Sequence, residues 1–513
     1  MNTIKKLLCV FLTMILISGV AVGCGTTGNG NGSTGAASDH PAQTSANANL
    51  TGAMTDENGN PVDSQGYILD SIPDSVKYTG EEIQILYWQD VENPEYFSEY
   101  EGEGSEIDSA IFRRNLKVEQ RLGVSLVYIP TSGNSANAAN FLAFVKGALS
   151  GGEKFDIISA HSRSVGLCAY NGLTVDLSKA GGLDFEKPWW QDSLLTTATV
   201  NGQLHFVSGD ISTNMLYMMY VVYFNKLQLS SHPDLTLPYD DVDNGAWTID
   251  RMIGMSEGFY SNLDGIPGKT AGDQYAQSAK ELHLDALLWG SDILGFRNEG
   301  GKLMLDTNFT GQKCSDLIDK LYNYFYNTDD AILCDDSKEY KDIFADGRSL
   351  FIIDRADIAI SDLNDKQFDM GILPVPKYDA DQESYRTIIG NPFSLYAIPV
   401  FAQDPERSAY VLECLASESY RQVTPVIFEI TMKTRYSDES RDAKMYDYAR
   451  DGAVYDLSRV FWKVISSEGG KAPDTLFEEA LSTGGSGWTK TIKASQRVLN
   501  NIISSIDKKF SAE

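Results

Sequence analysis

The segment Ile83-Gln84-Ile85-Leu86-Tyr87-Trp88 follows a long polar stretch, and the pattern that it starts decides the fold. Its length and apolar composition predict a buried strand. Similar segments follow at residues 124–129 and 155–159, and two stretches with helical periodicity, at 107–122 and 141–149, lie between the three strands. Strands that alternate with helices predict a parallel, doubly wound α/β sheet.

Ligands of such sheets bind at the carboxyl ends of the strands. Those ends carry Trp88, Gln89 and Asp90 after the first strand, and His161 and Ser162 after the third. An extended chain places Trp88 and Asp90 on one side, which suits an aromatic platform beside a hydroxyl acceptor. A core tryptophan followed by a solvated loop acid is the alternative. For His161, a bond to a ligand hydroxyl and a purely structural role both remain open.

Further signals extend the alternating pattern along the chain. Gly123 directly follows the first predicted helix, where a left-handed cap is expected. Residues 216–224 and 350–353 are predicted to be strands, and Asp404 followed by Pro405 predicts the start of another helix. No period of about 20 to 50 residues repeats, which argues against solenoids and propellers.

The amino terminus predicts export. Two lysines precede an apolar run at residues 7–22, as in a secretory signal peptide. The run ends in Ala21-Val22-Gly23-Cys24, which resembles the lipobox of bacterial lipoproteins, although Ala stands where Leu is commoner. We therefore expect residues 1–23 to be removed and Cys24 to be lipidated, placing the protein on the outer face of the cell membrane. An ordinary secretion signal is the alternative.

Residues 24–78 are predicted to form a flexible tether, because they are rich in Gly, Thr, Ser, Asn and Ala and poor in apolar clusters. Asp56, Asn58 and Asn60 have the spacing of a calcium loop. Pro61 and Tyr67, however, stand where that loop needs Gly and Glu. We expect no calcium site here.

Charge narrows the range of partners. The formal net charge of −29 disfavours binding to nucleic acid, anionic lipid and polyanionic ligands, whereas a neutral ligand is unaffected. No second apolar stretch is long enough to span a membrane, so membrane contact is expected through the lipid anchor only. The remaining chain is long enough for two or three domains with sizeable cores.

Metal and cofactor sites are not expected. The sequence has no Cys-x-x-Cys or His-Glu-x-x-His motif, and its five histidines are far apart. Four cysteines remain after export, and the sequence leaves open whether two of them form a disulfide; they are Cys168, Cys314, Cys334 and Cys414.

Several short stretches together resemble the extracellular solute-binding proteins of family 1, the group of ABC-transporter carbohydrate receptors that includes the maltose-binding protein. Each is weakly specific, but they occur in the family's order behind the lipobox. They are Phe155-Asp156-Ile157-Ile158, Leu173-Thr174-Val175-Asp176-Leu177, Asn201-Gly202-Gln203-Leu204-His205-Phe206-Val207, Tyr223-Phe224-Asn225-Lys226, Trp247-Thr248-Ile249-Asp250, Asp346-Gly347-Arg348-Ser349-Leu350-Phe351 and Gly371-Ile372-Leu373-Pro374-Val375-Pro376-Lys377.

The resemblance implies a type II periplasmic-binding-protein fold, with two doubly wound lobes joined by crossing hinge strands. An amino-terminal lobe of residues 79–208 and 396–437 and a carboxyl-terminal lobe of 209–395 and 438–513 would hold a sugar or oligosaccharide between them. The protein would act as a monomer that delivers this solute to ABC permease subunits, without catalysing a reaction.

The resemblance also implies binding residues. Asp210 corresponds to a ligand-contacting acid at the first crossing, with a hinge acid as the alternative. Trp289 lies where the family supplies an aromatic from the second lobe, and core packing is its alternative. Asn391 lies at the return crossing, and Trp462 where an aromatic stacks on the sugar.

Asp354 and Arg355 follow the predicted strand at 350–353, so the carboxyl-end rule and the resemblance both favour ligand contact there. A local ion pair is the alternative.

Two other classes of protein remain as hypotheses. An exported glycoside hydrolase needs two facing carboxylates, and no motif singles out such a pair among the 71 acids. A surface lipoprotein that binds a peptide or another non-sugar ligand fits the same fold.

Overall fold

The computed structural model describes residues 47–48, 54–99, 102, 104–433 and 440–511. These residues all belong to one compact unit that spans residues 44–513. The predicted signal peptide, Cys24 and the predicted tether as far as residue 46 lie outside the described residues.

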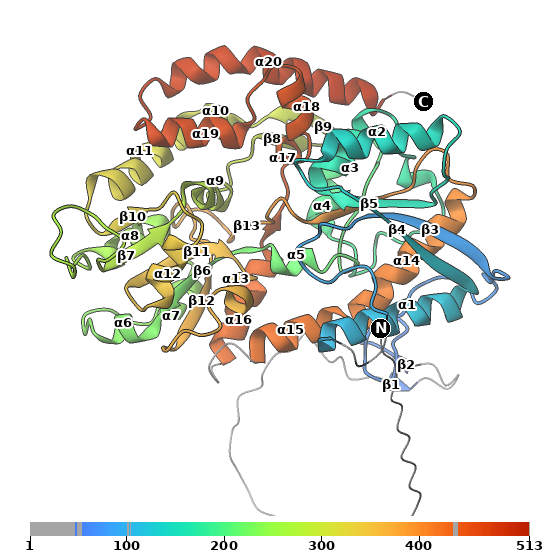
Figure 1. Cartoon of the computed structure of the whole chain (residues 1–513), viewed down its shortest axis with the longest axis horizontal. Coiled ribbons are helices and arrows are strands. Elements are labelled where there is room, and N and C mark those ends of the chain that lie inside the picture. Colours follow the sequence, from blue (N-terminus) through green and yellow to red (C-terminus); the bar gives the residue numbers. More distant parts are fainter. Residues whose placement is uncertain (1–46, 49–53, 100–101, 103, 434–439, 512–513) are drawn as a thin grey trace, which may run out of the picture. The chain divides into compact units, whose positions relative to one another are not determined.

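The first sheet has four strands in the order β14 (Ser394–Ala397), β5 (Ile157–His161), β3 (Glu81–Trp88) and β4 (Val124–Thr131). β3 pairs in parallel with β4 and β5, while β14 runs antiparallel to β5 (Figure 1). The predicted order of strand, helix, strand, helix and strand is confirmed. We call the part built on this sheet the first lobe.

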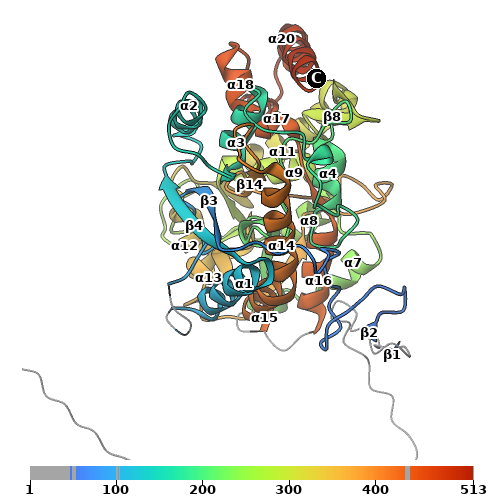
Figure 2. The ribbon, with the colours of Figure 1, turned by 90° about the vertical axis from the view of Figure 1, so that its right-hand side faces the viewer.

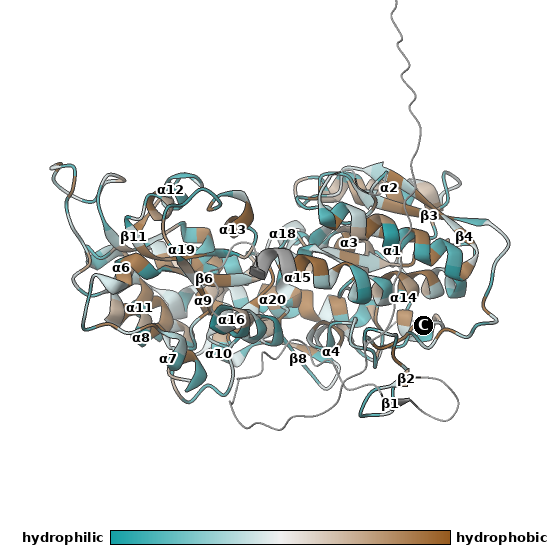
Figure 3. Cartoon of the chain, turned by 90° about the horizontal axis from the view of Figure 1, so that it is seen from below, coloured by the Kyte–Doolittle hydropathy of each residue, from teal (hydrophilic) through white to brown (hydrophobic). Residues whose placement is uncertain are grey.

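Helices cover both faces of the first sheet. α1 (Glu106–Leu122) and α14 (Pro405–Gln422) lie on one side, and α2 (Ala138–Leu149) and α3 (Ser162–Tyr170) on the other (Figures 1 and 2). α1 and α14 carry both hydrophobic and hydrophilic residues, as helices with one buried face do (Figure 3).

Both predicted helix boundaries are confirmed. Gly123 ends α1 with a φ of 70°, a left-handed conformation that glycine adopts readily. Asp404 caps α14 by accepting a hydrogen bond from the Arg407 amide, with Pro405 at the first helical position.

The second sheet forms a second lobe. Its order is β10 (Ala331–Leu333), β7 (Tyr275–Ala279), β11 (Ser349–Arg355), β6 (Tyr220–Asn225) and β12 (Met370–Pro374). β7 is parallel to β10 and β11, and β6 is antiparallel to β11 and β12. The helices that contact these strands include α11 (Gln312–Asn327), α12 (Glu339–Ala345) and α16 (Ser440–Asp451).

Crossing segments join the lobes. Val207 bridges to Tyr396 beside the first sheet, and Met219 bridges to Ile389 beside the second. The outgoing and returning chains therefore lie together between these two bridges. A later segment, β15 (Ala453–Val454), joins them by pairing with β13 (Thr387–Ile388).

One predicted strand is wrong. Residues 216–224 do not form one strand, because α5 (Asn214–Tyr217) precedes β6. All residues of both elements are buried, and an apolar run cannot distinguish a buried helical turn from a strand. β14 begins at Ser394, close to the predicted lobe boundary after residue 395.

The sequence assigned residues 438–513 to the carboxyl-terminal lobe. The helices of this region, however, are not confined to the second lobe. α17 (Leu457–Val460) and α18 (Trp462–Ser467) contact α3 of the first lobe. α19 (Pro473–Ser482) packs on α11, and α20 (Trp488–Lys509) packs on β9 (Lys302–Leu305). This region therefore bridges the two lobes.

The tether prediction is wrong for residues 54–78. Val62 and Ile72 are buried, and the Asp70 carboxylate lies 3.5 Å from the guanidinium groups of both Arg121 and Arg421. The polar composition of this segment hid a few apolar residues that pack on the first lobe. The Asn and Asp residues of this segment stabilise turns. In one such turn, the Asp56 carboxylate accepts hydrogen bonds from the backbone amides at positions 58 and 60.

The remaining elements complete the connections between those described above. They are β1 (Asn47–Ala48), β2 (Met54–Thr55), η1 (Leu177–Lys179), α4 (Asp192–Ala198), α6 (Lys226–Ser230), α7 (Tyr239–Asp243), α8 (Ile249–Ser256), η2 (Glu281–Leu284), α9 (Asp285–Gly290), β8 (Phe296–Glu299), α10 (Thr307–Thr310), α13 (Ile358–Ser361) and α15 (Thr424–Lys433).

The packing of α17 on α3 depends on Gly166. A Cβ at this position would lie 2.8 Å from the Val460 carbonyl oxygen and 2.5 Å from its Cγ1. Because the carbonyl belongs to the backbone, it cannot move aside as the end of a side chain can. The lack of a side chain at Gly166 is therefore what lets the carboxyl-terminal helices reach the first lobe.

We expect Gly166→Ala to destabilise the protein by about 1–3 kcal/mol, because the clash outweighs the higher helix propensity of alanine. Gly147→Ala in α2 is the matched control, since a Cβ there meets nothing within 4 Å. The control should be neutral or stabilising by up to about 1 kcal/mol. Urea unfolding measures both, and equal effects of the two substitutions would contradict the packing argument.

Candidate functional site

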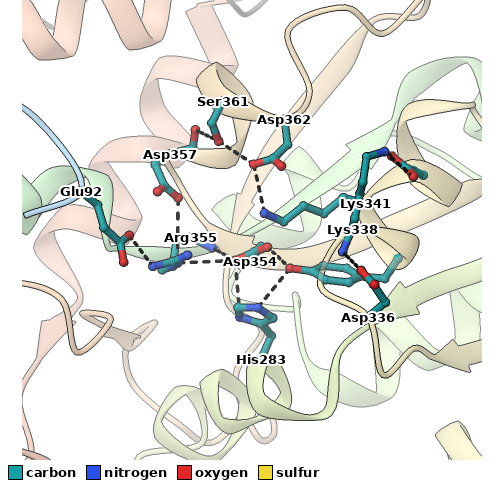
Figure 4. Close-up of polar contacts among 12 residues, drawn as sticks. Glu92, His283, Asp336, Lys338, Lys341, Asp354, Arg355, Asp357, Ser361 and Asp362 are labelled. Carbon is teal, nitrogen blue, oxygen red and sulfur yellow. Dashed lines mark hydrogen bonds and ion pairs between the residues drawn. The ribbon is translucent and has the colours of Figure 1, made fainter. Parts of the chain in front are cut away.

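The carboxyl ends of strands from the two sheets are joined by an ion pair. Glu92, in the loop after β3, lies 3.0 Å from the guanidinium of Arg355, the last residue of β11 (Figure 4). The first residue belongs to the first lobe and the second to the second lobe. Ligands of such sheets bind beyond these strand ends, so the candidate site lies between the lobes, around this pair.

Arg355 is held by acids of its own lobe. Its backbone amide donates to the Asp354 carboxylate at 2.7 Å, and its Nε lies 4.0 Å from Asp357 (Figure 4). Burial raises the pKa of Asp357 to about 6, against a smaller opposing effect of the arginine. The sequence left ligand contact and a local ion pair open for Arg355. The structure shows ion pairs, one of which spans the lobes.

Asp354 is fully buried, and the Tyr340 hydroxyl donates a hydrogen bond to it. His283 lies beside both, with Nδ1 3.4 Å from the Asp354 carboxylate and Nε2 3.1 Å from the Tyr340 hydroxyl. The Tyr220 hydroxyl is 3.0 Å from Nδ1. Burial lowers the pKa of His283, which favours the neutral ring. Asp354 thus anchors a buried network.

Sequence reasoning missed Glu92, Tyr220, His283 and Tyr340 as parts of this region. Glu92 lies beyond the strand end in an irregular loop. Tyr220 is the first residue of a strand that runs antiparallel to its neighbours. The carboxyl-end rule selects residues that follow a strand, so it does not select Tyr220. His283 and Tyr340 lie in local helical segments, and no motif marked them.

Trp88 is 1% exposed at the end of β3, and its Nε1 donates to the Ser394 hydroxyl at 2.9 Å. Asp90 accepts hydrogen bonds from the backbone amides of Gly133 and Asn134, while Gln89 is exposed. These contacts correspond to the core alternative for Trp88. They give Asp90 a structural role in the loop after β4, and ligand contact by these three residues stays a prediction.

His161 and Ser162 connect β5 to α3 and to the returning chain. His161 Nδ1 accepts a hydrogen bond from the Arg163 amide at 3.1 Å and so caps α3. Burial lowers the pKa of His161 well below its ordinary value. The Ser162 hydroxyl donates to the Asn391 carbonyl at 2.9 Å, whereas the buried Asn391 Oδ1 has no hydrogen-bond partner among the described residues.

The two tryptophans expected from the second lobe and the carboxyl-terminal region are each covered by a guanidinium. Arg163 lies over the half-buried ring of Trp462 at 4.7 Å. Arg459 lies over the buried ring of Trp289 at 4.5 Å, and the Trp289 Nε1 donates to Asp456 at 3.0 Å. Both are cation–π contacts. The structure thus adds two arginines that the sequence did not single out.

Asp210 is separate from these residues. It lines a small cavity with Tyr455 and Arg450, and its carboxylate lies 3.6 Å from the Arg450 guanidinium. Its Oδ2 has no hydrogen-bond partner among the described residues, and burial raises its pKa to about 6. None of the other predicted ligand residues lines this cavity. Its position corresponds to the hinge alternative.

Among the described residues, cysteines and potential metal ligands form no further site. The four cysteines are buried and free. Within the described part of the chain, no group of three or more His, Cys, Asp or Glu residues could hold a metal ion. No helix among the described residues is both long enough and apolar enough to cross a bilayer.

No protein-family profile matches this sequence, and no curated protein matches it. Solved structures do match its fold. A cyclo/maltodextrin-binding protein complexed with maltotetraose has a TM-score of 0.52 at 13% identity, covering 84% of this chain and 98% of its own. A cyclic α-maltosyl-1,6-maltose binding protein from Arthrobacter globiformis has a TM-score of 0.55 at 12% identity, covering 83% and 99%.

A third match is the galacto-N-biose/lacto-N-biose I-binding protein of an ABC transporter from Bifidobacterium longum, in complex with lacto-N-biose. Its TM-score is 0.53 at 11% identity, covering 84% of this chain and 98% of its own. At such identities the likeness shows the fold. The predicted type II periplasmic-binding-protein fold, with two doubly wound lobes joined by crossing strands, is confirmed.

The raised pKa of Asp210 predicts a pH dependence of stability. The folded state favours the protonated acid, so the stability of the wild type relative to Asp210→Asn should be highest below pH 3.8 and fall as the pH rises through about 6. The loss should be about 1–3 kcal/mol. Urea unfolding of both proteins between about pH 4 and pH 7 measures it. Parallel pH profiles would refute the assignment.

Proposed function

We propose that this protein is the substrate-binding lipoprotein of an ABC importer, which captures a sugar or oligosaccharide between its lobes and delivers it to permease subunits. The observation that carries the proposal is the Glu92–Arg355 ion pair, because it joins the strand ends where ligands of such sheets bind. The solved structures of the same fold described above are sugar-binding proteins, which supports a carbohydrate as the solute.

The action would be binding and closure, without a reaction on the solute. A ligand that contacts both lobes stabilises the closed form by its differential affinity for the two arrangements. The paired crossing segments are where the rotation would occur. The contact between Arg355 and Glu92 spans the two lobes, so this pair adds to the free energy that holds the lobes together.

A thermal-shift screen with mono- and oligosaccharides tests the proposal, because a ligand of the native state raises the melting temperature by mass action. We expect at least one neutral or acidic saccharide to bind saturably and to be recovered unchanged. Turnover of the sugar would make the protein an enzyme. Binding of peptides with no response to any saccharide would favour another class of ligand.

The interlobe pair makes a second prediction for the identified ligand. Glu92→Gln and Arg355→Met should each weaken affinity by about twofold to fivefold, the effect of a partly exposed ion pair. The double variant should lose no more than the larger single effect, since both substitutions remove one interaction. Arg251→Met is the control, because Arg251 pairs with Asp241 inside one lobe. Additive losses at positions 92 and 355 would contradict a closure role for the pair.

The proposed membrane anchor depends on Cys24. We expect Cys24→Ser to abolish incorporation of labelled fatty acid in a bacterial host and to move the protein from the detergent phase to the aqueous phase. Binding of the solute should not change, because the described lobes begin after this residue. Unchanged labelling of the variant would leave an ordinary secretion signal as the better hypothesis.

A further inference from the structure

Arg459 is a buried cation that has no anionic partner among the described residues. Its residue exposure is 7%, and no carboxylate of the described residues forms an ion pair with it. Nη1 donates to the Ile389 carbonyl at 2.6 Å, while Nε has no partner and Nη2 makes no hydrogen bond within the described part of the chain. A buried charge normally has a counter-ion, because leaving water is costly. Arg459 therefore lacks the partner that its position requires.

Other cationic or basic groups lie on α3 and α18, which both contact the helix α17 that carries Arg459. Arg163, Arg459 and Lys463 all act electrostatically on His161, so the four side chains lie near one another. His161 and Arg163 come from the strand end and first turn of α3, and the other two come from α17 and α18. The Nε of Arg163 also lacks a hydrogen-bond partner among the described residues. We call these four residues the basic cluster.

The nearby acids pair with only one cation of the basic cluster within the described part of the chain. The Asp474 carboxylate lies 3.5 Å from the Arg163 guanidinium, so this pair is a long ion pair. Asp285 is buried as well, and its Oδ1 has no hydrogen-bond partner among the described residues. Burial raises the pKa of Asp285 well above its ordinary value, and the neighbouring carboxylates of Glu478 and Asp474 act in the same direction. Of the three permanent cations, only Arg163 has a carboxylate within ion-pair distance among the described residues.

We propose that the basic cluster binds an anionic group of the solute, so that the ligand is an acidic saccharide bearing a carboxylate, sulfate or phosphate. This proposal rests on the proposed sugar-binding function and names its ligand class. The free edge of the Arg459 guanidinium, Nε with Nη2, has the fork geometry that binds such groups with two parallel hydrogen bonds. The net charge of −29 opposes a polyanion, but one anionic group at a local basic cluster is compatible with it.

The guanidinium groups over Trp289 and Trp462 support this ligand class. A neutral pyranose needs an open aromatic face for its apolar C–H groups. Here a guanidinium covers one face of each ring, at 4.5 Å for Trp289 and 4.7 Å for Trp462. Stacking holds each guanidinium in place without using its hydrogen-bond donors, so the arginines are oriented in advance for an anion.

Calorimetry with matched sugars tests the inference. The probes are cellobiose against cellobiouronic acid, galactobiose against digalacturonic acid, and glucose against its 6-sulfate and 6-phosphate. We expect the acidic member of at least one pair to bind tenfold or more tightly than its neutral partner, with an affinity that falls as salt is added. The member that binds identifies the anionic group as carboxylate, sulfate or phosphate.

Variants connect that preference to the basic cluster. Arg459→Gln should reduce the acid preference at least tenfold, and Arg459→Lys should restore part of it by returning the charge without the fork. Lys463→Gln should reduce the same preference. Because Lys463 is only half-buried, this variant tests the inference even if the Arg459 variants misfold. Arg251→Gln should leave the preference unchanged.

The outcomes separate this inference from the proposed function. Tighter binding of the neutral sugars, or an acid preference that survives both Arg459→Gln and Lys463→Gln, would overturn the acidic ligand class and leave the sugar receptor standing. A protein that binds none of the neutral or acidic saccharides would overturn the proposed function as well.

Discussion

The parallel pairing of β3 with β4 and β5 is the constraint on which the site depends. Parallel strands end on the same edge of a sheet, so this pairing brings the loops after Trp88 and His161 together. The second sheet presents the end of β11 in the same way, with Arg355 as its last residue. The contact between Glu92 and Arg355 then follows from two strand ends that face each other.

Charge, more than aromatic surface, characterises the boundary between the lobes. The first lobe contributes Glu92, His161 and Arg163, and the second contributes Asp354 with Arg355. Several polar atoms there are buried without a hydrogen-bond partner among the described residues, including Nε of three arginines, at positions 163, 355 and 459. Such atoms are rare in folded proteins because each costs free energy, and binding sites are a common reason for them.

Local patterns allowed much of the fold to be predicted. The first three strands, the cap at Gly123 and the start of α14 at Pro405 depend on residues adjacent in sequence, and all were correct. The start of β6 and the packed segment at 54–78 were missed. Both depend on distant partners, since a short apolar or polar run acquires its conformation from what it packs against.

For the site, the sequence by itself determined where the strands end. The carboxyl-end rule then placed Asp354, Arg355 and His161 near the lobe boundary. Only the tertiary structure decided what these side chains contact, that Trp88 is packed in the core, and that Asp210 faces Arg450. It also decided that Arg459 is buried over Trp289 and forms no ion pair with a carboxylate of the described residues. The physical reason is range: strand and helix signals act over a few residues, whereas burial and ion pairing join residues up to hundreds of positions apart.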